Sequence, residues 1–419
     1  MNKLKIGICG WGNVATGLYK TILDNQKEIE SNSNIKLEIV VIGARRDNPK
    51  CDPQNTIIER DIFNVLNHEI DVLVELIGGV EVARELILKS IEKGINVVTA
   101  NKAVLYHHGD EIFSLADKKN VHVLYESSVC AGTPIIKMLH EELAANKVSK
   151  ISGMLNGTSN FILSEMEEGA DFEDTLKFAQ KEGYAEADPS FDIEGYDAAH
   201  KIGILSSLAF GTSLPPDDFY IEGIEDIEAN DFIYAAEEGF SIKHLAVSSL
   251  SEESIELRAH PVLISNSKYL ANLKGVRNGI EIETDLIGKL HVAGSGAGQA
   301  STASGVISDL IYISNIKDKI SSENKHKSSK QILKIDDLKF ENYINIKTSI
   351  SEDNFASIEQ VFNNNKIFIK KIKWKELSKN KSAVIIFTDL HFEKDLNKCI
   401  SEIEQLDEIE SVKSIRIES

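Results

Sequence analysis

The sequence predicts an α/β protein with a doubly wound parallel sheet, an α+β substrate domain and a C-terminal ferredoxin-like domain. Strand-like and helix-like segments alternate through the first third of the chain, which is the pattern of a parallel sheet covered by helices. The tail follows the order βαββαβ, which is the ferredoxin-like split. A chain of 419 residues exceeds one ordinary hydrophobic core, so we expect two or three domains.

The first third of the chain is expected to form five strands and two clear helices. Residues 3–9 form a short apolar strand, and a glycine turn at 10–15 leads into a helix over 16–30. A buried strand follows at 37–42. The remaining expected elements are strands at 71–77, 96–99 and 121–125 and a helix at 82–93.

The middle of the chain, residues 132–293, is less regular and reads as an inserted α+β domain. It has long helices and several strand candidates, and an apolar helix through Val306 and Leu310 then returns the chain to the first domain. The strand candidates are 151–154, 241–247 and 254–259. The expected division is residues 1–130 with 295–320, residues 131–294, a linker at 321–337, and residues 338–419.

The expected linker is rich in Lys, Ser, Asn and Asp and has few apolar positions. Regular elements resume behind it and give the tail its βαββαβ order. The expected elements are strands at 343–350, 367–372, 383–388 and 412–417, with helices at 354–363 and 392–406.

Composition excludes several classes of partner. The net charge of -20 argues against nucleic acid and anionic membranes as partners. No apolar run approaches the roughly 18 residues that a membrane helix needs. The N-terminus lacks the apolar core and cleavage site of a signal peptide. The four cysteines show no metal or redox spacing, so we expect reduced thiols and a cytoplasmic protein.

A glycine motif follows the first strand and opens the first helix. Gly10, Gly12 and Ala15 have the spacing of the dinucleotide fingerprint, in which Ala is permitted at the third position. Bare backbone at the two glycines lets a pyrophosphate approach the helix N-terminus, where negative charge is favoured. Any strand–turn–helix could hold such glycines, but the βαβ context favours a Rossmann-type nucleotide site.

The end of the second strand bears on the choice of cofactor. The acidic residue that would bind the ribose hydroxyls of NAD is not at this strand end, which carries Arg45 and Arg46 instead. Two arginines suit the 2′-phosphate of NADP. Asp47 lies close behind, so NAD stays possible, and the alternative interpretation is a basic surface turn.

An acidic segment in the middle of the chain carries the most informative chemistry. Four carboxylates come within a short stretch, and a helix predicted from Tyr196 to Phe210 follows the first three. Asp197 and Lys201 are four apart on that helix, so they share one face. Such an arrangement suits binding an ammonium group and transferring a proton; the alternative is a solvated loop with a helix ion pair. The four carboxylates are Glu186, Asp188, Asp192 and Asp197.

Three further segments follow strands. Lys102 should lie at the carboxyl edge of the parallel sheet, where ligands of open α/β sheets bind, although it could be an ordinary exposed lysine. In residues 156–160, Thr158 or Ser159 would make a good helix N-cap, and the alternative is a mere turn. Backbone carbonyls of residues 126–133 could coordinate a hard cation. We expect Cys130 to be a bystander, since no base partner can be named.

Together these segments resemble the homoserine dehydrogenase family over nearly the whole chain. The long acidic motif is highly specific, whereas the glycine fingerprint alone is weak. The resemblance implies interconversion of L-homoserine and L-aspartate 4-semialdehyde with NAD(P), in threonine, methionine and isoleucine biosynthesis. The motifs that carry it are residues 10–15, 75–79, 99–102, 156–160, 183–201 and 296–298.

The resemblance also implies roles for single residues. Lys201 would be the proton donor in the reducing direction, and Lys102 the second lysine near substrate and nicotinamide. Glu186 and Asp197 would hold the substrate amine and hydroxyl, with support from Asp192. Cofactor contacts would come from Gly10, Trp11, Gly12, Asn13, Val14, Arg45, Lys102, Gly183 and Gly298. A structural Na+ or K+ would bind backbone oxygens of Glu126, Val129, Ala131 and Thr133.

The tail resembles an ACT regulatory domain, for which threonine is the usual feedback ligand in this family. The loop 351–355 lacks the Pro-Gly commonly found there, and Ser301 stands where the family usually has proline. Whether threonine binds therefore stays open. The resemblance implies a homodimer or higher homo-oligomer.

Two other functions remain open at this point. One is a different NAD(P)-dependent dehydrogenase acting on an amino-acid semialdehyde. The other is a non-catalytic amino-acid sensor, which would have no need for the lysine pair Lys102 and Lys201.

Overall fold

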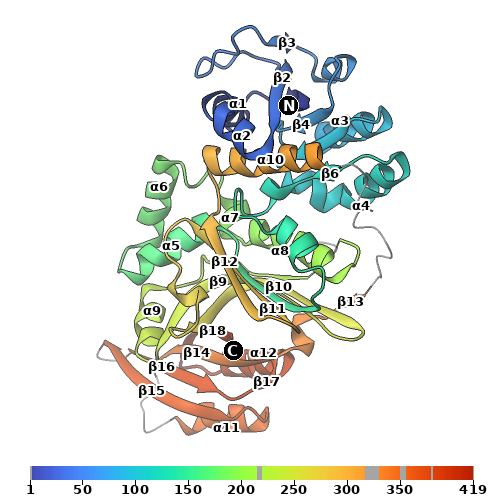
Figure 1. Cartoon of the computed structure of the whole chain (residues 1–419). Coiled ribbons are helices and arrows are strands. Elements are labelled where there is room, and N and C mark those ends of the chain that lie inside the picture. The colour runs from blue at the N-terminus through green and yellow to red at the C-terminus, as the bar shows by residue number, and fades with distance from the viewer. Residues whose placement is uncertain (1, 215–218, 317–329, 350–354, 379–380, 419) are drawn as a thin grey trace.

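The computed structural model describes residues 2–214, 219–316, 330–349, 355–378 and 381–418. Figure 1 shows three layers of structure, with the N-terminal sheet and its helices at the top, a mixed sheet in the middle and the C-terminal strands at the bottom. Among the helices in these described ranges, none has an apolar stretch long enough to cross a membrane.

The N-terminal part contains a six-stranded parallel sheet with the order β3-β2-β1-β4-β5-β6. This is the 3-2-1-4-5-6 order of a doubly wound dinucleotide-binding sheet, so the predicted fold class is confirmed. The strands are β1 (Asn2–Cys9), β2 (Ile35–Gly43), β3 (Ile57–Glu59), β4 (Val72–Glu75), β5 (Asn96–Thr99) and β6 (Val123–Leu124).

Helices cover both faces of this sheet. The helix expected at 16–30 starts earlier and is interrupted at Asn25, which gives α1 (Asn13–Asp24) and α2 (Gln26–Ser33). The late helix α10 (Gln299–Asn315) packs beside α1, and its Val306 and Leu310 are buried in the same core as β1 (Figure 1). The other flanking helices are α3 (Glu81–Glu92) and α4 (Lys102–Lys119).

The second sheet has 12 strands and runs through the middle and C-terminal parts without a break. Its main path is β12-β11-β7-β9-β10-β18-β14-β16-β15. The hairpin of β11 (Arg277–Thr284) and β12 (Gly288–Ser295) was not predicted. The other strands of the middle part are β7 (Val148–Met154), β8 (Tyr220–Ile221), β9 (Phe240–Leu250) and β10 (Ser254–Ser265).

The C-terminal part has the predicted βαββαβ order. Its strands lie in the order β18-β14-β16-β15, which is the ferredoxin-like arrangement. Only part of the expected linker 321–337 is described, and there β13 (Gln331–Ile332) pairs with β10. The C-terminal elements are β14 (Lys339–Thr348), α11 (Ala356–Asn364), β15 (Ile369–Ser378), β16 (Lys381–Thr388), β17 (His391–Phe392), α12 (Glu393–Ile403) and β18 (Ile409–Glu418).

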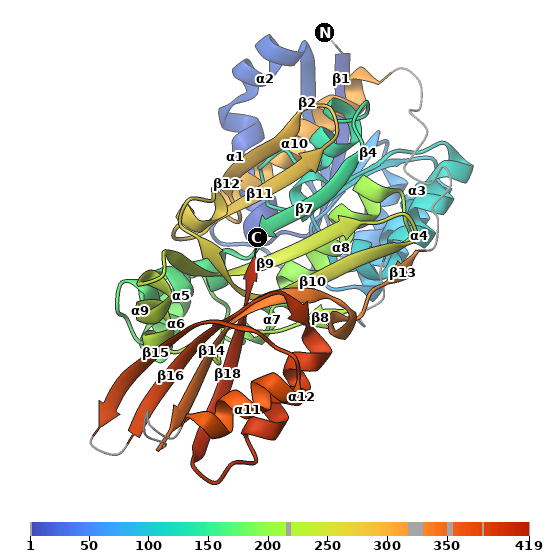
Figure 2. The same ribbon diagram turned by 90° about the horizontal axis from the view of Figure 1, so that it is seen from below.

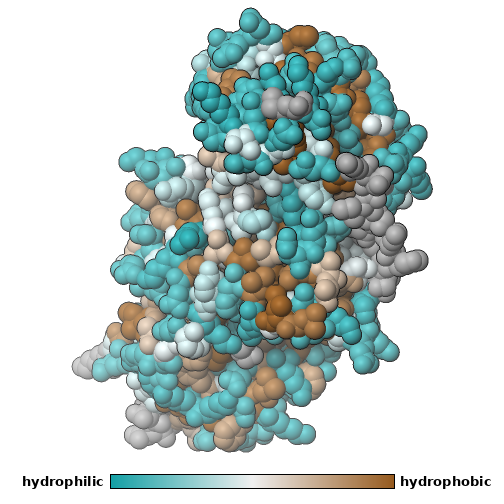
Figure 3. Space-filling model, in the orientation of Figure 1, coloured by the Kyte–Doolittle hydropathy of each residue, from teal (hydrophilic) through white to brown (hydrophobic). Residues whose placement is uncertain are grey.

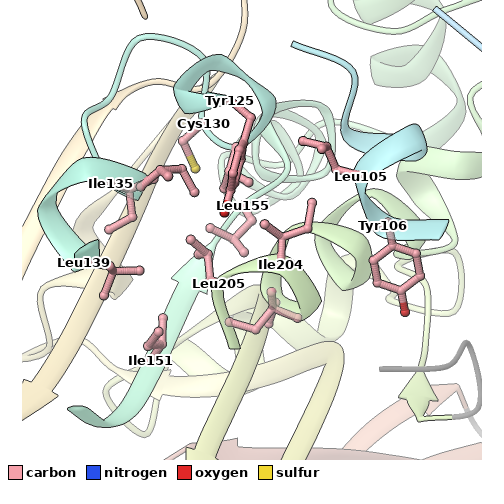
Figure 4. Close-up of a cluster of buried hydrophobic side chains, with 14 of the residues drawn as sticks. Leu105, Tyr106, Tyr125, Cys130, Ile135, Leu139, Ile151, Leu155, Ile204 and Leu205 are labelled. Atoms are coloured by element: carbon pink, nitrogen blue, oxygen red, sulfur yellow. The ribbon is translucent and has the colours of Figure 1, made fainter. Parts of the chain in front are cut away.

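Helices α5 (Gly157–Glu167), α6 (Phe172–Glu182), α7 (Ser190–Ile193), α8 (Tyr196–Phe210) and α9 (Ala229–Ala236) belong to the middle part. A hydrophobic cluster joins α8 to the N-terminal helix α4 and to β7. Figure 4 shows Leu105 of α4, Leu205 of α8 and Ile151 of β7 among its side chains. This packing fixes α4 and α8 relative to each other, and each of them carries one of the two candidate lysines.

Candidate active site

The turn after β1 leaves room for a pyrophosphate. Gly10 has a φ of 103°, and a Cβ there would lie 2.4 Å from the carbonyl oxygen of Leu76. Gly12 precedes the first residue of α1, and a Cβ there would meet no atom within 4 Å. No side chain of the described residues caps this helix. Its first N–H groups therefore face an open space that suits an anion.

A cavity of about 580 Å³ lies beside this turn, and its lining includes Gly10, Trp11, Gly12, Arg45 and Arg46. Both arginines are exposed. The cavity is therefore lined both by glycine backbone of the turn and by two cationic side chains.

The loop behind Arg46 contains Asp47, which the sequence analysis named as the reason that NAD stays possible, and Asn48, which it missed. Asp47 is paired with Arg60, with 2.6 Å between Nη2 and Oδ1, so its charge is partly neutralised. Asn48 donates from Nδ2 to the carbonyl of Trp11 at 2.9 Å and to Oγ1 of Thr16 at 3.0 Å. No sequence motif predicts the contacts of Asp47 and Asn48, because their partners lie 13 or more positions away in the sequence.

Lys102 is placed by a set of buried polar groups at the ends of β4 and β5. Thr99 donates from Oγ1 to Oε2 of the buried Glu75 at 2.6 Å, and its Oγ1 also accepts from the backbone of Asn101. The Asn101 side chain caps α4 by accepting from Val104 N–H at 3.2 Å. Lys102 is therefore the first residue of α4, at the carboxyl edge of the parallel sheet as predicted.

Both candidate lysines meet the same carboxylate. Lys201 donates from Nζ to Oδ2 of Asp197 at 2.8 Å and to the carbonyl of Leu155 at 2.7 Å. Lys102 forms a short ion pair with Oδ1 of Asp197, and its Nζ lies 4.7 Å from the ring centre of Phe191. Lys201 is 9% exposed and Asp197 7%, so these two charges interact away from bulk water, and Lys102 is half-buried beside them.

Asn156 joins the two carboxylates of the site. Its Nδ2 donates to Oδ1 of Asp192 at 2.7 Å and to Oδ2 of Asp197 at 2.8 Å. Its Oδ1 accepts from the backbone of Ser159, so the same side chain caps α5. Thr158 adds a bond from Oγ1 to Asp192 at 3.3 Å. The expected cap, Thr158 or Ser159, is wrong, because both residues lie inside α5 and Asn156 caps it. The link to the acidic segment was not predicted.

Burial and charge shift the pKa values of the cluster in different directions. Burial lowers the pKa of Lys102, although Asp197 opposes this. Burial also acts to lower the pKa of Lys201, but attraction to Asp197 outweighs it and the pKa is raised. Burial acts against ionisation of Asp197, yet the two ammonium groups hold its pKa well below the usual range. Burial, together with the charge of Asp197, raises the pKa of Asp192.

The loop at 126–133 has an unusual backbone. Cys130 and Ala131 are consecutive left-handed residues, with φ values of 57° and 51°. Cys130 is buried, and burial raises the pKa of its thiol. The Oγ1 of Thr133 is buried and has no hydrogen-bond partner among the described residues. The carboxylate of Glu126 accepts hydrogen bonds from the backbone N–H groups of residues 135, 136 and 137.

Two family models match this chain. The NAD-binding domain of homoserine dehydrogenase matches residues 10–126, and the homoserine dehydrogenase model matches residues 134–311. A homoserine dehydrogenase from Pseudomonas aeruginosa is 41% identical, and the match covers 100% of this chain and 99% of that protein. This chain belongs to the homoserine dehydrogenase family.

Solved structures agree with that assignment. A homoserine dehydrogenase from Thiobacillus denitrificans has a TM-score of 0.93 at 36% identity, covering 100% of this chain and 99% of the other. A hyperthermophilic archaeal homoserine dehydrogenase mutant in complex with NADPH has a TM-score of 0.63 at 27% identity, covering 74% and 98%. Neither family match reaches the C-terminal ferredoxin-like unit.

Membership of the homoserine dehydrogenase family decides between the functions left open by the sequence. The chain is an NAD(P)-dependent oxidoreductase acting on a CH–OH group, and the predicted enzyme is confirmed. The alternative of a non-catalytic sensor is wrong.

Not every expected site residue of the homoserine dehydrogenase motif lies in the cluster. Glu186 is exposed, and its carboxylate forms no hydrogen bond or ion pair with the residues that the structure describes. Gly183 ends α6 with a φ of 77° and is also exposed. Gly298 precedes α10 and has a φ of 121°. The neighbouring Gln299 donates a hydrogen bond from Nε2 to the carbonyl of Asn13 at 2.8 Å. The second glycine turn thus lies beside the first, as a shared cofactor site requires.

Proposed function

We propose that Lys201 protonates the carbonyl oxygen of L-aspartate 4-semialdehyde when the aldehyde is reduced to L-homoserine. A bound nicotinamide supplies the hydride. An ammonium group has three N–H donors, and Asp197 and the Leu155 carbonyl account for two of those of Lys201. The third is left for the substrate oxygen. The observation that supports this role is the burial of Lys201 against Asp197 at 2.8 Å, which keeps the acid charged and oriented.

Lys102 and the two aspartates complete the proposed site. Lys102 faces the same carboxylate from α4, so it brings a second positive charge to the substrate and nicotinamide. Asp197 holds both ammonium groups and contributes to binding the substrate, and Asp192 supports it through Asn156. In the oxidising direction one lysine must take up the proton of the homoserine hydroxyl. Lys102 has the lowered pKa, and Lys201 has the contact that orients it.

The overall reaction is tested by mixing the protein with NADPH and L-aspartate 4-semialdehyde and following the absorbance of the reduced cofactor. We expect oxidation of NADPH that depends on the aldehyde. Unchanged absorbance with a folded protein that binds NADPH would contradict the proposed chemistry.

Glu186 is proposed to hold the substrate amine, because its carboxylate is exposed and is not bonded by another residue that the structure describes. The Glu186→Gln variant should raise the KM for homoserine about 10-fold or more with a small change in kcat, because a hydrogen bond to a charged group contributes about 1.5–3 kcal/mol. Steady-state kinetics with varied homoserine measure this. Glu182→Gln, at the end of α6, is the matched control on an exposed glutamate. Equal KM values in the two variants would exclude Glu186 from amine binding.

NADP is the proposed preferred cofactor, supported by the two exposed arginines at the cavity and by the pairing of Asp47 with Arg60. Arg45→Ala should raise the KM for NADPH roughly 10-fold while the KM for NADH stays the same. Only NADPH has a 2′-phosphate, so only NADPH loses a contact with the arginine. Lys50→Ala removes an exposed cation from the same loop and serves as control. An equal rise of the KM for NADPH and for NADH would show that Arg45 does not bind the 2′-phosphate.

A structural Na+ or K+ is proposed at backbone oxygens of Glu126, Val129, Ala131 and Thr133. The consecutive left-handed residues turn successive carbonyls of this loop in unusual directions, and oxygen ligands suit hard cations. Across the described residues, no cluster of three or more His, Cys, Asp or Glu is placed to hold a metal, so carbonyl oxygens are the available ligands.

The remaining proposals concern assembly and location. The hairpin between β11 and β12 exposes Leu286 by 67% and Ile287 by 54%, and Figure 3 shows hydrophobic side chains gathered over the middle of the molecule. These surfaces support a homodimer or higher homo-oligomer. The four cysteines are free and buried, which supports a cytoplasmic location.

The C-terminal unit is proposed to act as an ACT-like regulatory domain over 338–419, with threonine as a possible effector. Its ferredoxin-like order supports this. Most of the loop without Pro-Gly, residues 351–354, lies outside the described residues. The proposed division further upstream is a dinucleotide domain at 1–130 and 295–320, a catalytic and dimerisation domain at 131–294, and a linker at 321–337.

A further inference from the structure

The last strand of the chain connects the C-terminal unit with the catalytic part. β18 pairs in parallel with β10, where Val262 lies opposite Arg416 and Ile264 lies opposite Glu418. On its other side it pairs with β14. Figure 2 shows β18 running from the C-terminal strands to β10. β18 therefore links the two parts directly.

Arg416 forms a buried cluster of polar contacts at this junction. It is 6% exposed and donates from Nη1 to Oε2 of Glu222 at 2.8 Å. Its Nη2 donates to the hydroxyl of Tyr220 at 2.9 Å and forms a short ion pair with Glu393. Tyr220 in turn donates to Glu222 at 2.6 Å. The guanidinium thus fixes Glu222, which lies in the segment between α8 and α9.

The backbone around Glu222 holds the junction between α7 and α8. The Glu222 carbonyl lies 2.9 Å from Nε2 of the buried His244. Both groups lie close to Gly195. A Cβ at this position would lie 2.9 Å from Nε2 of His244 and 3.1 Å from the carbonyl oxygen of Glu222. Ile224 then donates from its N–H to the carbonyl of Ile193 at 2.9 Å. Gly195 directly precedes α8, and Ile193 ends α7.

A shared hydrophobic cluster reinforces the same connection. Ala185 and Ile193 flank Glu186 and Asp192 in sequence, and both are buried. They belong to one cluster with Tyr343 and Ile415 of the C-terminal strands. Side chains of close-packed interiors do not shift independently. The substrate segment and the C-terminal unit therefore rest on one core.

We propose that Arg416 is a positioning residue for the reaction, acting through Glu222 and the α7–α8 junction on Asp192 and Asp197. Arg416 itself touches neither substrate nor cofactor. The inference rests on the roles proposed above for Asp192 and Asp197.

The test compares two changes of a carboxylate to an amide beside a buried arginine. Glu222→Gln weakens the contact between Arg416 and the junction, whereas Glu418→Gln weakens the pairs with Arg258 and Lys150 two positions further along β18. We expect kcat/KM for homoserine to fall about 10-fold or more in Glu222→Gln only, since a misplacement of about 1 Å can cost roughly 10²-fold. The Kd for NADPH should stay within about twofold in both variants, because neither carboxylate is near the proposed cofactor site.

Hydrogen exchange of the backbone amides of residues 190–197 provides a readout that needs no turnover. Exchange there should become faster in Glu222→Gln and remain unchanged in Glu418→Gln. If Glu222→Gln does not fold, Tyr220→Phe is the substitute, because it removes one hydroxyl contact to the same carboxylate. It should lower kcat/KM and speed up exchange in the same way, but by smaller amounts. Equal kinetics and equal exchange in the Glu222 and Glu418 variants would overturn the proposal. If Glu222→Gln exchanges faster but the unmodified protein does not reduce the aldehyde, the coupling between Arg416 and residues 190–197 is retained. The roles proposed for Asp192 and Asp197 are then contradicted.

Discussion

Replacing Lys201 with alanine is expected to lower kcat for reduction of L-aspartate 4-semialdehyde by about 10²- to 10⁴-fold, the usual contribution of a positioned general acid. Lys201 is 9% exposed and bonded to Asp197 and to the Leu155 carbonyl, so water cannot easily take its place. Binding of NADPH should change little, because Lys201 is not among the expected cofactor contacts. Single-turnover kinetics and cofactor titration measure the two quantities separately.

The matched comparison is Lys102→Ala. Both lysines bond Asp197, but only Lys201 has a second fixed acceptor, so we expect the larger loss of kcat at Lys201 and the larger rise of KM at Lys102. The result also decides which lysine moves the proton. A greater loss of kcat at Lys102 would transfer the acid role to that residue.

The Asp197→Asn variant should shift the pH dependence of the reaction by about one to three units toward acid, since an opposite charge at this distance changes a pKa by that amount. Asp197 favours the ammonium form of both Lys102 and Lys201. Without it, both lysines lose their protons at lower pH. Oxidation, which needs a deprotonated lysine, should then reach its plateau at lower pH, and reduction should begin to fall at lower pH. Profiles of kcat in both directions measure this.

The same variant should also be less stable near neutral pH, by about 3–5 kcal/mol, because removing one member of a buried ion pair leaves the other uncompensated. The folded-state pKa of Asp197 is depressed, so its contribution is present above the unfolded pKa of about 3.9 and disappears as the pH falls below it. Denaturant unfolding at several pH values tests this. Glu194→Gln, an exposed carboxylate three residues away, is the control. A stability loss independent of pH would show that the carboxylate charge is not its cause.

Local sequence signals predicted the parts of the fold that depend on neighbouring residues. The fingerprint at 10–15, the alternation of strands and helices and the βαββαβ tail are all present in the structure. The break of the first helix at Asn25 and the β11–β12 hairpin were missed. The polar pattern of the helix continues across such a break. The hairpin strands do alternate, with Ile280 and Ile282 alternating with glutamates and Leu290 and Val292 beyond Gly288, so this signal was present in the sequence and was overlooked.

The candidate site was predictable only in its components. Asp197 and Lys201 are four apart on a helix, so their contact follows from helix geometry. Lys102 and Asp197 are 95 positions apart, and no periodicity relates them. Glu186 was expected in the same cluster as Asp197, yet it lies exposed on the preceding loop, because Gly183 and Pro189 take that loop away from the helix that carries Asp197.

The sequence by itself determined the class of protein: a dinucleotide turn, a lysine at a strand end and an acidic segment of a specific family are all local patterns. The tertiary structure decided which groups meet. Asn156 links Asp192 to Asp197, and β18 joins the C-terminal unit to β10. Such contacts depend on how separately formed elements pack in space. Burial of apolar surface stabilises such contacts, and close pairing offsets the cost of taking charges out of water; both depend on several segments of the chain at once.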